Sequence, residues 1–298
     1  MAEQSSFSNG SESPGESWLP SVQVDFGAMS HVGKVRQNNE DQFLAVRLKK
    51  SLEVLQGTLP AEEDVLLPDL EAYAFLVADG IGGAEAGERA SAFVVREAKK
   101  HLLYTSKWFF HLEDPDNEVR LRLIRESLER LDRVLIQKAK QDPTLSGMGS
   151  TLTATFSIGL DLLVVQVGDS RAYLYRAGHL EQLTRDQTMV QDLIDDGLLD
   201  PEEAKIHRTR HVLTNAIGGM PGVYGEVFNV QLDHGDRLLL STDGLHDQVD
   251  NDRIAEILNL HTDPKAACQA LVDAALEQGG PDNITVVVAS YAVKNAKK

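Results

Sequence analysis

The sequence predicts an α+β fold in which antiparallel sheets are covered by pairs of helices. Strand-like segments come in batches joined by short connections, and two helices stand between one batch and the next. This order argues against alternating βαβ units, in which each helix joins two parallel strands. No internal repeat is present, so one domain over residues 21–293 is the economical interpretation.

The strand predictions depend on short apolar runs that stop at turn residues. The run 73–78 ends abruptly at Asp79-Gly80, and the run 237–241 ends just before Asp243-Gly244. Further strands are predicted at residues 22–27, 42–47, 150–158, 162–167, 172–176, 179–183, 226–232 and 284–289.

The helix predictions depend on apolar residues spaced three or four apart. The segment 117–140 has one such stripe, and the segment 86–103 has a second. The stripe of 117–140 consists of Leu121, Ile124, Leu128, Leu131 and Leu135. Shorter helices are predicted at residues 187–197, 201–206, 251–260 and 264–278.

Three segments are predicted to lie outside the regular fold. Residues 1–20 are rich in Ser, Glu and Gly without the design of a signal peptide, and we expect a disordered leader. Residues 48–71 show no clear period and are interpreted as a surface insertion in a long hairpin connection. Residues 294–298 form a tail.

Charge and composition exclude several classes of partner. The formal net charge is −17, so nucleic acid and anionic lipid are disfavoured, and a two-metal nuclease lacks the basic groove it needs. No apolar run is long enough for a transmembrane helix. The single cysteine, Cys268, fits a reduced cytoplasm. We expect a cytoplasmic monomer that binds neither membrane nor nucleic acid.

Five aspartates at strand ends or in adjacent turns are the candidate chemical groups. An isolated Asp-Gly is most simply a hairpin turn. Asp79 and Asp243 differ because each follows a strongly apolar stretch, where an ionised carboxylate is costly unless it is paired or binds a cation. The five are Asp41, Asp79, Asp169, Asp243 and Asp282.

The ligand types indicate which cation such a site takes. Carboxylates, backbone carbonyls and waters suit Mg²⁺ or Mn²⁺. A zinc set that combines cysteine pairs with histidine pairs is not found in the sequence, which has a single cysteine. The sequence therefore predicts a site for hard divalent cations.

Six segments resemble the successive motifs of the type 2C, metal-dependent protein phosphatases (the PPM family), in the form common in bacteria. They occur in the family's order and span the chain after residue 21, and six matches in register are highly specific. The segments are GKVRQNNED (33–41), VADGIGG (77–83), GMGST (147–151), VGDSR (167–171), STDGL (241–245) and PDNIT (281–285).

The resemblance implies a four-layer αββα fold, a central antiparallel β-sandwich flanked by helix pairs, with two core Mn²⁺ or Mg²⁺ ions in a cleft at one end. Asp79 would bridge the two ions, and the carbonyl of Gly80 would bind one of them. Asp243 and Asp282 would complete the other. A phosphate monoester needs charge neutralisation and an activated water, which two such ions supply.

Four further positions receive roles from the same resemblance. Glu40 and Asp41 would bind the ions directly or through water. Asp169, with Asp243, matches the position of a third, weaker ion. Arg36 matches the arginine that grips the substrate phosphate, and its alternative is a surface arginine paired with a neighbouring acid.

Two regions of the chain depart from the simplest family pattern or add to it. Many eukaryotic members have a histidine after the Asp-Gly turn as the proposed acid, and here the position is Ile81, which cannot donate a proton. His207 and His211 are the alternative donors, unless a metal-bound water serves. Residues 184–218 resemble the family's flap, a mobile segment associated with substrate choice.

The function implied is metal-dependent hydrolysis of phosphoserine and phosphothreonine in proteins by a metal-activated water, opposing a serine/threonine kinase. The catalytic domain would span residues 21–293. The alternative is a non-catalytic module of the same fold that binds a phosphoprotein. That alternative is disfavoured because all the candidate carboxylates are present.

Overall fold

Two five-stranded antiparallel sheets form the centre of the protein. The computed structural model describes residues 22–50, 70–109, 117–219 and 222–293. The first sheet has the order β1 (Val22–His31), β12 (Ile284–Val293), β11 (Arg237–Ser241), β8 (Arg171–Arg176) and β9 (His179–Gln182). The second has the order β10 (Glu226–Gln231), β7 (Asp161–Val167), β6 (Leu152–Ile158), β3 (Leu70–Ala78) and β2 (Gln42–Lys50).

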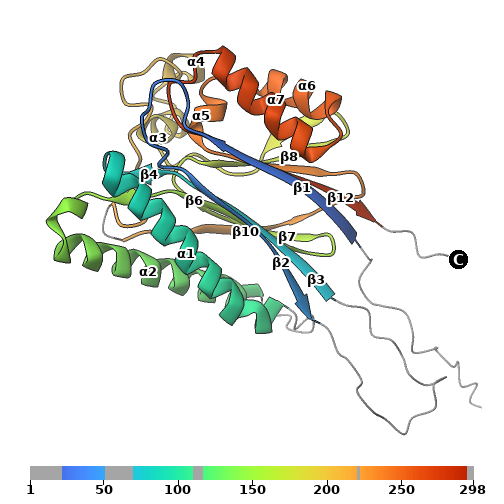
Figure 1. Ribbon diagram of the computed structural model, residues 1–298, viewed down its shortest axis with the longest axis horizontal. Helices are drawn as coiled ribbons and strands as arrows, with labels where there is room; N and C mark the ends of the chain where they lie inside the picture. Colours follow the sequence, from blue (N-terminus) through green and yellow to red (C-terminus); the bar gives the residue numbers. More distant parts are fainter. Residues whose placement is uncertain (1–21, 51–69, 110–116, 220–221, 294–298) are drawn as a thin grey trace, which may run out of the picture.

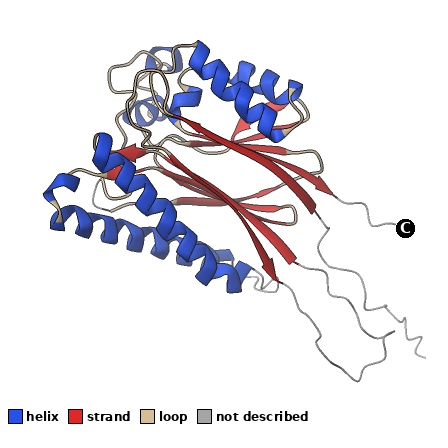
Figure 2. Ribbon diagram, viewed as in Figure 1, coloured by secondary structure: helices blue, strands red, loops and turns tan. Residues whose placement is uncertain are grey.

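Helix pairs cover the outer faces of both sheets (Figures 1 and 2). Helices α1 (Ala84–Phe109) and α2 (Asn117–Gln141) pack on the second sheet. Helices α6 (Asn251–Leu260) and α7 (Pro264–Glu277) pack on the first. The predicted four-layer αββα fold is confirmed.

The alternation of side chains along β3 explains why its sequence is almost uniformly apolar. Ala72, Ala74 and Leu76 point into the core under α1 and α2. Residues Tyr73, Phe75 and Val77 point into the core between the two sheets. Since successive side chains face opposite sides of a strand, a strand buried on both faces must be apolar at every position.

The predicted elements are present, with changes at their ends. β2 and β3 pair as far as Lys50 with Leu70, so residues 48–50 and 70–71 of the predicted insertion belong to strands. The predicted leader (1–20), residues 51–69 and the tail (294–298) lie outside the described residues. In the described part, none of the helices is both long and apolar enough to cross a membrane.

Several short elements add to the predicted set. The pair β4 (Gly80–Ile81) and β5 (Gly149–Ser150), the 3₁₀ turn η1 (Pro143–Leu145) and α5 (Asp243–His246) were not predicted. Helices α3 (Met189–Asp195) and α4 (Pro201–Ala204) are shorter than expected. Asp243, expected in a turn after a strand, is instead the first residue of α5.

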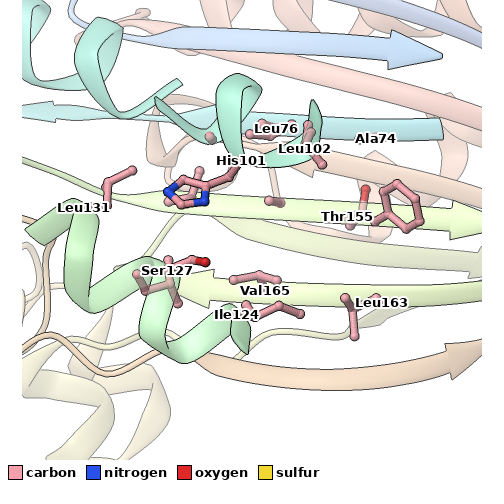
Figure 3. Close-up of a pocket in the computed structure, with 15 residues that line it drawn as sticks. Ala74, Leu76, His101, Leu102, Ile124, Ser127, Leu131, Thr155, Leu163 and Val165 are labelled. Carbon is pink, nitrogen blue, oxygen red and sulfur yellow. The ribbon is translucent and has the colours of Figure 1, made fainter. Parts of the chain in front are cut away.

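An apolar cavity of about 110 Å³ lies between α1, α2 and the second sheet (Figure 3). Its polar side chains in the described part are His101, Ser127 and Thr155. Ser127 Oγ donates to its own helix, at Leu123 O (2.8 Å). Burial lowers the pKa of His101 and disfavours its charged form. The cavity therefore gathers no set of charged groups, and the chemistry must lie elsewhere.

Candidate metal centre

An acidic cleft is lined by residues of β4 and α5, at the end of the sheets. Figure 1 shows where β4 and α5 lie in the fold. Arg36, His211 and several glycines line the cleft together with five acidic side chains. Those five are Glu40, Asp79, Asp169, Asp243 and Asp282. The sixth predicted acid, Asp41, lies behind the cleft wall with 4% of its surface exposed.

Strand register in the second sheet brings Asp41 and Asp79 together. β2 begins at Gln42 and β3 ends at Ala78, and these two residues are paired. Asp41 precedes the first residue of the pair and Asp79 follows the second. Because the strands are antiparallel, both carboxylates extend past the same end of the ladder.

The first sheet places three more acids at the same end. Ser241 of β11 is paired both with Arg171 of β8 and with Val286 of β12. Asp243 lies two residues beyond Ser241, and Asp169 lies two residues before Arg171. Asp282 lies two residues before the start of β12. The five predicted aspartates therefore converge because two antiparallel sheets end at one edge.

Two buried threonines, which were not predicted as site residues, hold Asp41 by its carboxylate and Asp79 by its backbone amide. Thr242 Oγ1 donates to Asp41 Oδ2 (2.7 Å) and accepts from the Thr285 amide (3.0 Å). Thr151 Oγ1 accepts from the Asp79 amide (2.8 Å). Both threonines are almost fully buried, so these hydrogen bonds hold the backbone and carboxylate in one arrangement.

Asn283 fastens the loop between β1 and β2, which contains Arg36 and Glu40. Its Oδ1 accepts from the Glu40 amide (2.7 Å). Its Nδ2 donates to the carbonyls of Val32 and Asn38 (both 2.9 Å). This buried side chain was missed as a site residue, although it stands in the PDNIT segment, directly before a strand.

Close packing at two glycines sets the position of Glu40 against α1. A Cβ on Gly87 would lie 2.0 Å from Glu40 Oε2, and a Cβ on Gly80 would lie 2.2 Å from the Gly87 carbonyl oxygen. Ser91 Oγ of α1 also donates to the Glu40 carbonyl (2.5 Å). An added Cβ at Gly80 would therefore clash with the backbone of α1, and one at Gly87 would force the Glu40 side chain to move.

Burial raises the pKa of the buried carboxylates and so disfavours their ionised form. It raises the pKa of Asp79 and Asp243 well above the usual range, and the neighbouring carboxylates raise them further. Burial raises the pKa of Asp41 to about 6 and that of Asp169 to about 7. Burial also raises the pKa of Glu40. Bound cations would reverse this cost, because opposite charge favours the ionised form.

The donor set fits Mn²⁺ or Mg²⁺. In the described part, no hydrogen bond is donated to the Asp243 carboxylate, and the acids at the cleft outnumber the arginines beside them. The groups that converge are oxygen donors, which hard cations prefer. Asp79, Asp243, Asp282 and Asp169, with Glu40 or Asp41, could hold such ions.

The two arginines near the centre are already paired. Arg36 Nη2 lies 2.6 Å from Asp282 Oδ2, and 52% of the Arg36 side chain is exposed. This is the alternative expected for Arg36, a surface arginine paired with an acid. Arg171 contacts Asp186 through two nitrogens (2.8 and 2.6 Å) and does not bond the Asp169 carboxylate.

The two candidate proton donors differ in position. His207 Nδ1 contacts Thr209 Oγ1 (2.9 Å) in its own loop, and His207 is absent from the described cleft lining. His211 does line the cleft, where its Nδ1 lies 3.4 Å from Asp247 Oδ2. Ile81 lines the cleft as an apolar residue.

Known protein phosphatases resemble this chain in sequence and in fold. The family model for protein phosphatase 2C matches residues 61–278. The serine/threonine protein phosphatase PstP of Mycobacterium tuberculosis is 35% identical over 89% of this chain. This chain spans only 44% of that relative. The protein phosphatase PhpP of Streptococcus pneumoniae is 33% identical, over 74% of this chain and 87% of its own.

A solved structure gives the same result for the three-dimensional fold. The catalytic domain of PstP, in complex with two manganese ions, superposes with a TM-score of 0.70 at 32% identity. The match covers 91% of this chain and 100% of that one. Sequence and fold agree along most of the length, and we conclude that the chain belongs to the protein phosphatase 2C family.

Proposed function

We propose that this protein hydrolyses phosphoserine and phosphothreonine in proteins, using Mn²⁺ or Mg²⁺. The observation that carries the proposal is the convergence of five aspartates from five separate segments on one edge of the sheets. Their negative charge is held in a partly buried cleft where the nearby arginines do not balance it. Divalent cations bound there neutralise the phosphate and lower the pKa of a bound water.

Each side chain has a role that follows from its place. Asp79, Asp243 and Asp282 face the cleft and would hold the two core ions, with the Gly80 carbonyl on one of them. Asp41 lies behind the wall and accepts from Thr242, so it would act through an intervening water. Asp169 would share a third, weaker ion with Asp243.

Arg36 is the group that would hold the substrate. Its guanidinium is half-exposed at the cleft rim, and its partner Asp282 is a candidate cation ligand. A cation on Asp282 would weaken this ion pair, so the planar fork becomes free to bind two phosphate oxygens. Ile81 donates no proton, so His211 or a water must protonate the leaving oxygen.

The relatives support the substrate class and the setting. PstP and PhpP are named as protein phosphatases, and the PstP structure holds two manganese ions. By extension, the partners of this chain would be proteins phosphorylated by a serine/threonine kinase. We further propose a cytoplasmic monomer with one catalytic domain over residues 21–293, which binds neither nucleic acid nor membrane. The net charge of −17 and the single, buried Cys268 support this setting.

The test is a metal titration of hydrolysis, with p-nitrophenyl phosphate and a panel of phosphopeptides as substrates. We expect activity to need Mn²⁺ or Mg²⁺, to vanish with EDTA, and to fall on the order of a hundredfold or more in Asp243→Asn. Asp161→Asn is the matched control, because Asp161 is exposed at the opposite end of β7. Activity that survives EDTA or Asp243→Asn would overturn the proposal. Mn²⁺ binding without turnover would instead favour the phosphoprotein-binding module.

A further inference from the structure

A pocket with three cationic side chains lies between α1, α2 and η1, in a protein whose formal net charge is −17. Its volume is about 280 Å³. The three cations are Arg89 and Arg96 of α1 and Lys138 of α2. Among the described residues that line it, none is acidic. We call it the basic pocket.

The floor of the basic pocket is apolar. Phe93, Leu135 and Met148 line it, and each is at most 5% exposed. Arg89, Phe93 and Arg96 follow one another at steps of four and three residues, so they share one face of α1. A group that fills the pocket therefore meets buried apolar surface below and exposed positive charge at the rim.

The positive charge at the rim is poorly neutralised. Arg96 Cζ lies 5.2 Å from the centre of the Phe93 ring, and Lys138 Nζ lies 5.1 Å from the same point. A cation over a ring is attracted to its face but keeps its charge. The carboxylate contacts of Arg89 and Arg96 are long, at 3.5 and 3.8 Å, and Lys138 forms no ion pair with a described residue.

The basic pocket is a neighbour of the acidic cleft. Met148 lines the pocket, and Gly147, which precedes it in the chain, lines the cleft. Helix α1 begins directly after Gly83, which also lines the cleft. At about 1.5 Å per residue, Arg89 and Arg96 lie about 8 and 18 Å along α1 from its first residue. An extended peptide of about three to six residues spans these distances.

We propose that the basic pocket binds an acidic segment of the phosphoprotein substrate, with an apolar side chain of that segment on its floor. The overall charge of this protein repels an anionic substrate, so a basic site beside the cleft would steer and hold it. The inference rests on the proposed function, because it assigns a docking site to the same substrate. The acidic segment would lie about three to six residues from the phosphorylated residue.

The experiment compares two phosphothreonine peptides as substrates of the full chain in Mn²⁺. One has a leucine flanked by glutamates within this spacing, and the other has serines in their place. Arg96→Gln combined with Lys138→Gln should raise KM for the acidic peptide by about three- to tenfold, with kcat unchanged. The kinetics of the serine peptide and of p-nitrophenyl phosphate should not change, and high salt should shrink the difference in KM.

The matched control removes the same charge elsewhere on the two helices. Lys99→Gln combined with Lys140→Gln does so, because both lysines are exposed and neither is among the described residues that line the pocket. Equal KM values for the acidic peptide in wild type and in the Arg96→Gln, Lys138→Gln protein would overturn the proposal. An equal rise in the control would also overturn it, because net charge alone would then explain the effect.

A binding assay separates this site from the proposed function. Fluorescence anisotropy of the unphosphorylated acidic peptide gives its Kd without turnover, and we expect the same loss of affinity in the Arg96→Gln, Lys138→Gln protein. If that protein instead lost binding to phosphatidylglycerol vesicles with unchanged peptide affinity, the pocket would serve a lipid surface and the proposal would be overturned. Absence of metal-dependent hydrolysis with intact peptide binding would refute the proposed function and support the pocket as the site of a binding module.

Discussion

The substitution Asp169→Asn tests whether the buried carboxylates of the centre destabilise the fold when no cation is bound. Burial, with the charges of Asp186 and Asp247, raises the pKa of Asp169 from 3.8 to about 7. A carboxyl with a raised folded-state pKa stabilises the fold while it is protonated, and that stability is lost as pH rises through about 7. Between pH 5.5 and 7.5 ionisation of this residue lowers the free energy of unfolding by roughly 2 kcal/mol.

The asparagine has no charge to bury, so the variant avoids this loss. We therefore expect Asp169→Asn to stabilise the metal-free protein at pH 7.5, and by roughly 2 kcal/mol less at pH 5.5. Burial holds the pKa of His246 well below its usual range, which costs stability at acid pH. Because both proteins contain His246, comparing them at each pH removes that contribution.

The assay is urea unfolding in EDTA at both pH values, with Asp161→Asn as a control for loss of an exposed carboxylate. Saturating Mn²⁺ should abolish or reverse the advantage of Asp169→Asn, since the variant lacks a proposed cation ligand. A stability difference that is the same at both pH values would refute the electrostatic reasoning. So would a less stable Asp169→Asn protein at pH 7.5 without metal.

Three further substitutions test other parts of the centre. Thr242→Val removes the hydroxyl between Asp41 and the Thr285 amide and should lower the free energy of urea unfolding by roughly 2–4 kcal/mol. The control Thr155→Val, whose hydroxyl makes only a 3.5 Å contact, should lower it much less, and equal losses would contradict the reasoning. Arg36→Ala should lower kcat/KM for a phosphopeptide by roughly 10- to 100-fold in steady-state kinetics with little change in unfolding, and an unchanged kcat/KM would exclude a phosphate contact. Gly87→Ala should weaken Mn²⁺ binding in calorimetry, because the added Cβ would meet the Glu40 side chain, even though alanine favours a helix by about 1 kcal/mol over glycine. An unchanged Mn²⁺ affinity would show that Glu40 moves aside without loss of binding.

The positions of the aspartates could be predicted because they are local features of the sequence. Asp79 and Asp243 each follow a run of apolar residues, and a charge at that point is visible without knowledge of the fold. The long helices could be predicted for the same reason, since the stripe of α2 repeats over many turns. α5 was missed because four residues beginning Asp-Gly have too short a pattern to distinguish from a turn.

The side chains that hold the aspartates could not be predicted, because their partners are distant in the sequence. Thr242 and Asp41 are 201 residues apart, and Asn283 and Glu40 are 243 apart. A threonine or asparagine beside a strand gives no indication of its hydrogen-bond partner until the strand register is known. The pairing of Arg36 with Asp282 is likewise a contact across 246 residues, which no local pattern reports.

The pairing of β12 with both β1 and β11 has a consequence for how the protein is made. Asp282, the last acid of the centre in chain order, stands just before β12, and the first described strand is β1. During synthesis, a nascent chain therefore has no complete centre until β12 has left the ribosome and paired with β1 and β11. An unfinished or clipped chain would lack Asp282, so the proposed hydrolysis could not begin before the sheets have closed.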